Sequence, residues 1–321
     1  MNVWMATAGE KQRDKLFSIY ARNLSFYRPD AEDQFVCPIC LKSFDRIALN
    51  KKDPEVIRAH VIPDLKMGER VVTLSCKTCD NHVGTTYDAH ILNEKKFHDF
   101  ETGLIEKSID LSYSSVKFPC YLKPSKEGEP PSFTLKAIDH HEPNFQTFTK
   151  DRPPQYHIEI ETGFVPMKRD ISLLHSAFLM MFYCFGYEYI LSENVECVRR
   201  IINGSSTFQS GSSFLLQISP DKPLPPVELP AIGILEKPKK INSFVVIVPS
   251  VENKKYLRGI ALPGFGVKGY ETYHRLLNSP KRGINITFNG LTGFSNRCLT
   301  MREFVGYCEK LWNYFTSSSQ V

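Results

Sequence analysis

The chain has 321 residues, of which 42% are hydrophobic and 23% are charged, and its formal net charge is +5. This composition is that of a packed globular protein and excludes the low hydrophobicity of a disordered chain. Because single domains usually hold about 100–200 residues, the length favours two domains. The first residues do not resemble a secretory signal, so we expect a cytoplasmic protein whose nine cysteines are reduced.

The first third of the chain contains one clear helical pattern and one clear loop. Apolar residues at helical spacing predict a helix within residues 10–30, which Pro29 ends. Proline, glycine and charged residues over 122–131 predict a loop or linker after the first domain. We therefore expect an N-terminal helix over 1–34, a first domain over 35–118 and a second domain over 119–321.

The second domain is predicted to be α+β from its alternation of strand-like and helix-like segments. We expect strands over 132–138, 156–164, 244–248 and 257–262, the last two paired, and a proline-rich loop over 220–238. We expect three helices, over 171–190, over 195–202 and from Thr300 to the end of the chain, and we expect Asp170 to cap the first of them. Residues 171–190 have the length of a membrane span. Because the segment includes the polar residues His175 and Glu188, we expect a buried core helix instead.

Four of the nine cysteines form two Cys-x-x-Cys pairs, Cys37 with Cys40 and Cys76 with Cys79, which are 35 residues apart. Each pair presents two thiolates from one turn, and four such ligands suit tetrahedral zinc. The alternative is that all four are unligated buried cysteines. The other five cysteines show no such spacing and are expected in the core.

The sequence around the cysteine pairs resembles a known family. Residues 58–63 read RAHVIP, and the second pair continues over 79–88 as CDNHVGTTYD. This arrangement is similar to the HNH (ββα-metal) endonuclease family over roughly a fifth of the chain. The resemblance implies an N-terminal ββα-metal domain stapled by structural zinc, followed by a larger α+β domain of unrecognised fold.

The resemblance also implies roles for single residues. His60 would be the general base that activates water, and Asp80 and Asp88 would hold a catalytic Mg²⁺ or Mn²⁺. Asp88 would face the same side as Asp80 if the helix is unbroken. Most members have an acid before the histidine and an asparagine further on, whereas this chain has Ala59 and no such asparagine. Orientation of the base would then fall to Thr73 or a backbone carbonyl, and His82 is an accessory candidate, although it could equally be an exposed helix histidine.

Positive charge is concentrated in the last third of the chain. Residues 222–321 contain fourteen Lys and Arg against six Asp and Glu, interleaved with tyrosine and phenylalanine. We expect Lys268, Arg275, Lys281 and Arg282 to contact DNA phosphates. The alternative is a solvated basic face without a partner.

The leading hypothesis is a metal-dependent endonuclease that hydrolyses double-stranded DNA in restriction or antiphage defence, without a membrane partner. Because an HNH site cuts one strand, a homodimer is expected. Two alternatives remain: a catalytically silent zinc-ribbon module that binds nucleic acid, and a nuclease controlled by a ligand-sensing C-terminal domain.

Overall fold

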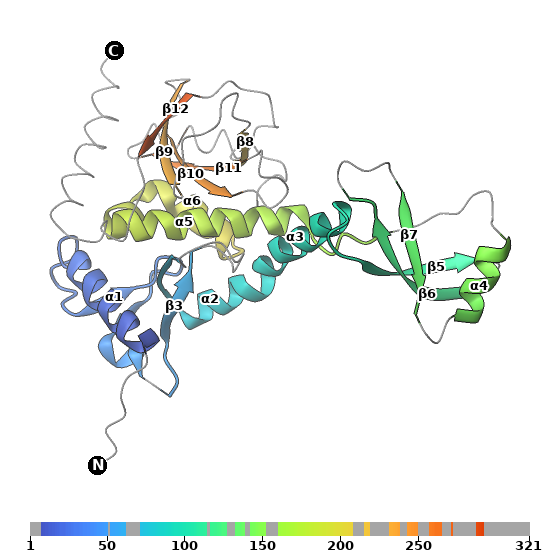
Figure 1. The fold of residues 1–321 in the computed structure, drawn as a ribbon. Helices are drawn as coiled ribbons and strands as arrows, with labels where there is room; N and C mark the ends of the chain where they lie inside the picture. The colour runs from blue at the N-terminus through green and yellow to red at the C-terminus, as the bar shows by residue number, and fades with distance from the viewer. Residues whose placement is uncertain are drawn as a thin grey trace. The chain divides into compact units, whose positions relative to one another are not determined.

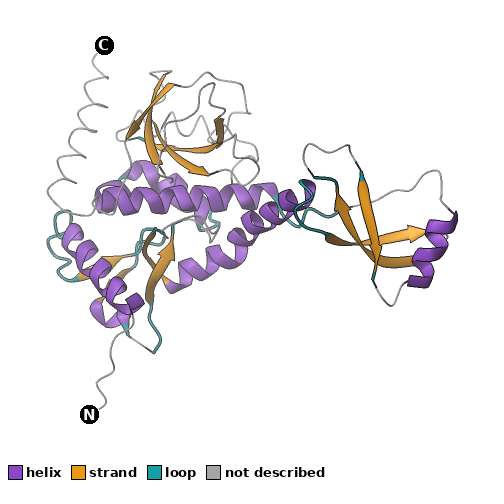
Figure 2. Ribbon diagram, viewed as in Figure 1, coloured by secondary structure: helices purple, strands orange, loops and turns teal. Residues whose placement is uncertain are grey.

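The computed structural model describes residues 8–50, 52–61, 71–113, 116–126, 132–138, 142–151, 160–207, 215–218, 231–237, 243–249, 257–264, 271 and 287–291. The chain divides into two compact units, Met1–Ala89 with Val165–Val321, and His90–Phe164. Both units combine helices with antiparallel sheets, so the α+β class is confirmed (Figures 1 and 2). The predicted boundaries at 34/35 and 118/119 stay predictions.

The N-terminal part of the first unit contains the predicted helix and two small hairpins. Its elements are α1 (Ala8–Leu24), β1 (Gln34–Val36), β2 (Ser43–Asp45), η1 (Arg46–Leu49), β3 (Val56–His60), β4 (Val72–Cys76), α2 (Lys77–Val83) and the π-helical segment η2 (Gly84–Asp88). Helix α1 buries Phe17, Tyr20 and Leu24, which confirms the predicted helix, although it ends at Leu24 rather than at Pro29.

Two antiparallel hairpins carry the cysteine pairs. Strands β1 and β2 pair from Gln34↔Asp45 to Val36↔Ser43, and the first cysteine pair lies in the connection between them. Strands β3 and β4 pair from Val56↔Cys76 to His60↔Val72, and β4 continues directly into α2. The second hairpin and its helix therefore follow one another in the order ββα.

Helix α5 (Pro166–Ile190) is the predicted core helix, and most of its residues are buried. It begins with proline after Val165, so the prediction that Asp170 caps it is wrong: Asp170 lies inside the helix, buried, and pairs with Arg169. Proline suits the first helical position because it needs no hydrogen-bond partner there. No helix in the described part of the chain has the length and hydropathy of a membrane span.

The two faces of α5 pack against different parts of the first unit. Toward the N-terminal hairpins, Phe182 stacks on Tyr20 with ring centroids 4.3 Å apart. Toward the C-terminal sheet, Phe185 contacts Phe244 at 5.4 Å, and the Tyr189 hydroxyl donates to the Pro263 carbonyl at 3.0 Å. Helix α5 thus lies between the hairpins and the sheet, within one hydrophobic core (Figure 1).

The C-terminal sheet has the order β12-β9-β10-β11-β8 and is antiparallel throughout. The elements after α5 are η4 (Glu193–Val195), α6 (Glu196–Ile202), β8 (Leu215–Ile218), β9 (Ala231–Lys237), β10 (Ser243–Pro249), β11 (Leu257–Pro263) and β12 (Thr287–Leu291). The short helix and the paired strands at 244–248 and 257–262 are confirmed. The loop predicted over 220–238 is wrong for Ala231–Lys237, because the prolines lie at the ends of this strand and not within it. The helix predicted after Thr300 lies outside the described residues.

The second unit contains α3 (Ala89–Glu101), β5 (Lys107–Tyr113), β6 (Val116–Pro124), β7 (Phe133–Ala137) and α4 (Glu142–Asp151). Its core includes Phe100, Ile109, Cys120 and Leu122. The strand predicted over 132–138 is confirmed as β7, whereas the loop predicted over 122–131 is wrong at 122–124, which belong to β6. The strand predicted over 156–164 is absent at 160–164, and residues 156–159 lie outside the described part.

Candidate metal centre

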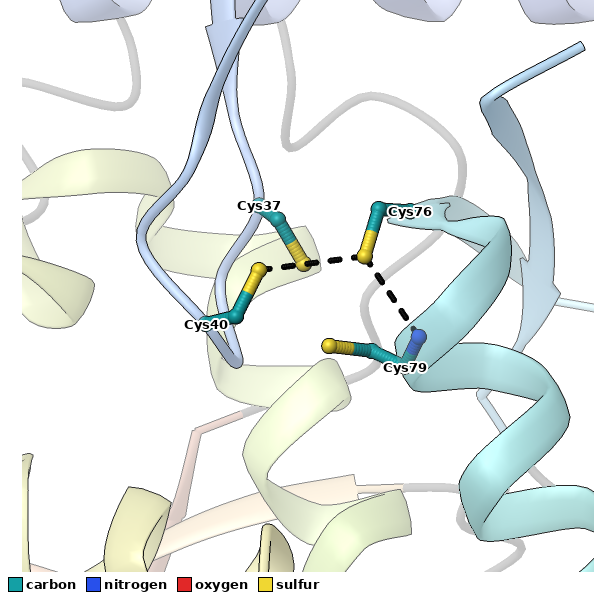
Figure 3. Close-up of side chains that lie close together, drawn as sticks. All are labelled: Cys37, Cys40, Cys76 and Cys79. Carbon is teal, nitrogen blue, oxygen red and sulfur yellow. Dashed lines mark hydrogen bonds between the residues drawn. The ribbon is translucent and has the colours of Figure 1, made fainter.

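The first cysteine pair is held by a tight turn after β1. The Cys37 amide donates to the Lys42 carbonyl, and the Leu41 amide donates to the Cys37 carbonyl, both at 2.9 Å. Leu41 adopts a φ of 58°, which turns the chain back into β2. These bonds fix the backbone so that Cys37 and Cys40 face the same side of the turn (Figure 3).

The second cysteine pair lies at the junction of β4 and α2. Cys76 is the N-cap of α2, and its sulfur accepts a hydrogen bond from the Cys79 amide at 3.4 Å. A side chain at the N-cap satisfies a backbone donor that the helix leaves open. The strand-to-helix junction therefore positions both thiols.

The four thiols form one cluster, with all sulfur atoms within 4.8 Å of one another (Figure 3). The Cys40 and Cys76 sulfurs are 3.8 Å apart. Tetrahedral zinc with Zn–S bonds of about 2.3 Å requires sulfur separations of about 3.8 Å. Cys37 and Cys76 are buried and Cys40 and Cys79 half-buried, so the cluster fits a closed four-coordinate metal such as zinc.

Hydrogen bonding within the cluster shifts the pKa values of the four thiols in opposite directions. Burial acts to raise the pKa of Cys37, but hydrogen bonds from Cys76 and Cys79 outweigh it and lower the pKa to about 7. The pKa of Cys40 is lowered by hydrogen bonding, first to Cys37. The pKa values of Cys76 and Cys79 are raised, in both cases first by hydrogen bonding to Cys37. Since the thiolate is the form that binds metal, a divalent ion would have to displace the protons of this second pair.

His60 and Thr73 lie on the second hairpin. His60 is the last residue of β3 and is exposed, whereas its neighbour Ala59 is fully buried and pairs with Thr73. The Thr73 hydroxyl is 2.5 Å from the hydroxyl of Tyr20. Because neighbouring residues of a strand point to opposite faces, Thr73 and His60 face opposite sides of the hairpin, and the structure does not bring Thr73 to His60.

Asp80 and Asp88 are half-buried, and both have raised pKa values. Burial, then the charge of Asp88, raises the pKa of Asp80 to about 6. Burial also raises the pKa of Asp88 to about 6, against a hydrogen bond from Ser172. The assumption of an unbroken α-helix was wrong, because Gly84–Asp88 is π-helical. His82 is exposed on α2 and lies edge-on to Tyr87, with ring centroids 5.7 Å apart.

Ser172 is a residue that the sequence analysis missed. It lies in the first turns of α5, and its hydroxyl donates to the Asp88 carboxylate at 2.5 Å. A serine within an apolar segment carries no signal of such a partner, because the contact spans 84 positions of sequence. The predicted DNA contacts Lys268, Arg275, Lys281 and Arg282 lie outside the described residues.

Comparison of the chain with family models, curated proteins and solved structures found no match.

Replacing Asp88 by asparagine should stabilise the zinc-loaded protein near neutral pH in the absence of Mg²⁺ and Mn²⁺. The pKa of Asp88 is about 6 in the folded protein, and its ordinary value is 3.8. Ionisation of this carboxyl group therefore lowers the unfolding free energy as the pH rises from about 4 to 6. A shift of about two units corresponds to roughly 3 kcal/mol at most. We expect thermal unfolding to show the gain at pH 7.5 but not at pH 3.5. An equal gain at both pH values would contradict this explanation.

Proposed function

We propose that this protein is a metal-dependent endonuclease that hydrolyses DNA phosphodiester bonds with an HNH-like site. The observation that carries the proposal is the order β3–β4–α2, in which a hairpin ending at Cys76 runs directly into a helix whose first turn holds Cys79. His60 lies on the first strand of this unit and Asp80 on its helix. One zinc-stapled ββα element therefore carries both chemical groups that hydrolysis needs.

His60 has the chemistry of a general base. It is exposed at the end of β3, where water and a phosphate backbone can reach it. Imidazole ionises near neutral pH, so it can take a proton from the attacking water.

Asp80 and Asp88 are the carboxylates proposed to hold Mg²⁺ or Mn²⁺. Such a cation would neutralise charge on the phosphate and the leaving oxygen. After burial, the charge of Asp88 helps to raise the pKa of Asp80, so a divalent ion would relieve this repulsion. Ser172 keeps Asp88 in a fixed orientation from α5.

The fully buried position of Ala59 favours a second candidate function. An acid at this position would face the interior beside Thr73 and Tyr20, so β3 offers no site for an acidic ligand there. With fewer carboxylates, the unit would be a zinc-stapled module that binds nucleic acid without cutting it.

The proposal is tested with supercoiled plasmid, Mg²⁺ or Mn²⁺ and the purified zinc-loaded protein. We expect the wild type to nick the plasmid, and His60→Ala to reduce the rate at least about 100-fold, as loss of a general base does. His98→Ala is the matched control, because His98 is a helix histidine outside the proposed site, and its rate should equal that of the wild type.

Two other outcomes would overturn the proposal or its residue assignment. If the folded, zinc-loaded wild type binds DNA in a gel-shift assay but cuts none, the binding module is the better description. If wild type and His60→Ala nick at the same rate, His60 is not the base.

A further inference from the structure

Arg58 lies on the same face of β3 as His60. Successive residues of a strand point to opposite faces, so positions 58 and 60 share one face and are about 6.5 Å apart along the strand. Both side chains are exposed, whereas Ala59 between them is fully buried. A permanent cation therefore lies two residues from the histidine that is proposed to act on DNA.

Helix α1 holds the guanidinium group of Arg58 in place. Its Nη1 atom donates to the side-chain oxygen of Gln12 at 2.9 Å, which engages one of the five N–H donors of an arginine. Gly9 lies on the same side of α1, and a Cβ atom there would be 2.9 Å from Nη2 and 3.1 Å from Cζ of Arg58. The guanidinium group can thus lie directly against the helix because Gly9 has no side chain.

A second cation, Arg13, lies one turn beyond Gly9 on α1. Side chains four residues apart on a helix are neighbours, with Cβ positions about 5–6 Å apart. Arg13 is 9% exposed, and its one partner among the described residues is the Leu49 carbonyl, which accepts from Nη2 at 2.8 Å. Its Nε atom is buried and has no hydrogen-bond partner in the same part of the chain. Since buried charges in proteins are ordinarily paired, the guanidinium group of Arg13 calls for an anion.

The acidic residues of α1 lie away from Arg58. At 3.6 residues per turn, Glu10 and Asp14 are about 160° around the helix from Gln12, which binds Arg58. The side of α1 that carries Gln12 therefore places no carboxylate of this helix beside the guanidinium group.

We propose that Arg58 and Arg13 bind a backbone phosphate of DNA, next to the phosphate that is hydrolysed beside His60. A guanidinium group suits this ligand because its N–H donors form a planar fork that matches two phosphate oxygens. The exposed group of Arg58 contacts the phosphate, and the phosphate supplies the negative charge that Arg13 lacks. The choice of DNA as ligand rests on the proposed function, but its binding can be measured without cleavage.

The salt dependence of DNA binding tests this site on the full-length, zinc-loaded protein without Mg²⁺ or Mn²⁺. Each phosphate contact contributes about 0.9 to the slope of log K against the logarithm of the salt concentration. By fluorescence anisotropy, we expect Arg58→Ala to reduce this slope by about one and to weaken binding to unrelated duplexes by the same factor. Arg28→Ala is the matched control, because Arg28 is also exposed, pairs with Asp30 at 3.5 Å and lies beyond the other end of α1.

Two further variants separate the phosphate site from a purely structural role. Gly9→Ala keeps every charge and suits a helix better than glycine, but its Cβ atom would displace the guanidinium group of Arg58. We expect it to weaken DNA binding without lowering the thermal stability. Arg13→Gln removes the buried charge and keeps an N–H donor for the Leu49 carbonyl, and we expect the same combination of results.

Arg58→Ala with the affinity and salt slope of the wild type would overturn the proposal, whether or not the wild type nicks plasmid. An equal loss of binding in Arg28→Ala would also overturn it, because the overall positive charge rather than this site would then be responsible. Normal DNA binding by a destabilised Arg13→Gln protein would overturn the role of Arg13. A wild type that binds DNA through Arg58 but cuts none would contradict the proposed nuclease and support the phosphate site.

Discussion

Replacing Cys40 by serine should leave the protein without stoichiometric zinc and strongly destabilise the N-terminal hairpins. The four sulfurs lie within 4.8 Å of one another, so the loss of one thiolate leaves an incomplete tetrahedral set. Structural zinc contributes about 10–16 kcal/mol of apparent binding free energy in small zinc domains, and much of this is folding free energy. We expect about one zinc per wild-type chain by mass spectrometry and less than a tenth of that in the variant.

Cys197→Ser is the matched control for this experiment. Cys197 is half-buried like Cys40, but it lies on α6, and its thiol donates to the Asn194 carbonyl at 3.5 Å, a bond that serine can replace. Its zinc content should equal that of the wild type. One zinc per chain retained by Cys40→Ser would show that the metal is held by other residues.

The parts of the fold that the sequence predicts are those that local patterns determine. Helix α1 follows from apolar spacing, and the pairing of β10 with β11 follows from two adjacent apolar runs. The cysteine cluster is predictable for the same reason, because each pair is closed by bonds within its own turn. Strand β9 was missed because the prolines on either side of it make the whole segment over 220–238 resemble a loop in composition.

The parts that the sequence does not predict depend on contacts between distant segments. Ser172 lies in a helix whose sequence signals only burial, and its partner Asp88 becomes visible only when α5 packs on η2. Thr73 was proposed to orient His60 because it lies near the place of the missing family asparagine. In the structure it faces the other side of the hairpin, where its hydroxyl contacts that of Tyr20. Pairing across long separations is set by tertiary packing, which single-sequence patterns do not encode.

The second large effect is expected from Phe182→Ala, which should lower the unfolding free energy by about 3–5 kcal/mol. Phe182 is fully buried, stacks on Tyr20 at 4.3 Å and contacts Tyr187 at 5.3 Å. Truncation therefore leaves a cavity between α5 and the hairpins, which the rigid neighbouring rings cannot fill. Denaturation by urea, followed by circular dichroism, measures the change against Phe26→Ala, an exposed phenylalanine that should cost little.

The same variant shows whether α5 supports the cysteine centre. Phe182 also lies 6.4 Å from Phe35, two residues before Cys37, so a cavity here should loosen the strand that leads into the cluster. We expect Phe182→Ala to release zinc faster than Phe26→Ala under native conditions, with the four cysteines unchanged. If Phe182→Ala loses stability but releases zinc at the wild-type rate, the two hairpins hold the metal by themselves and α5 contributes only to the core.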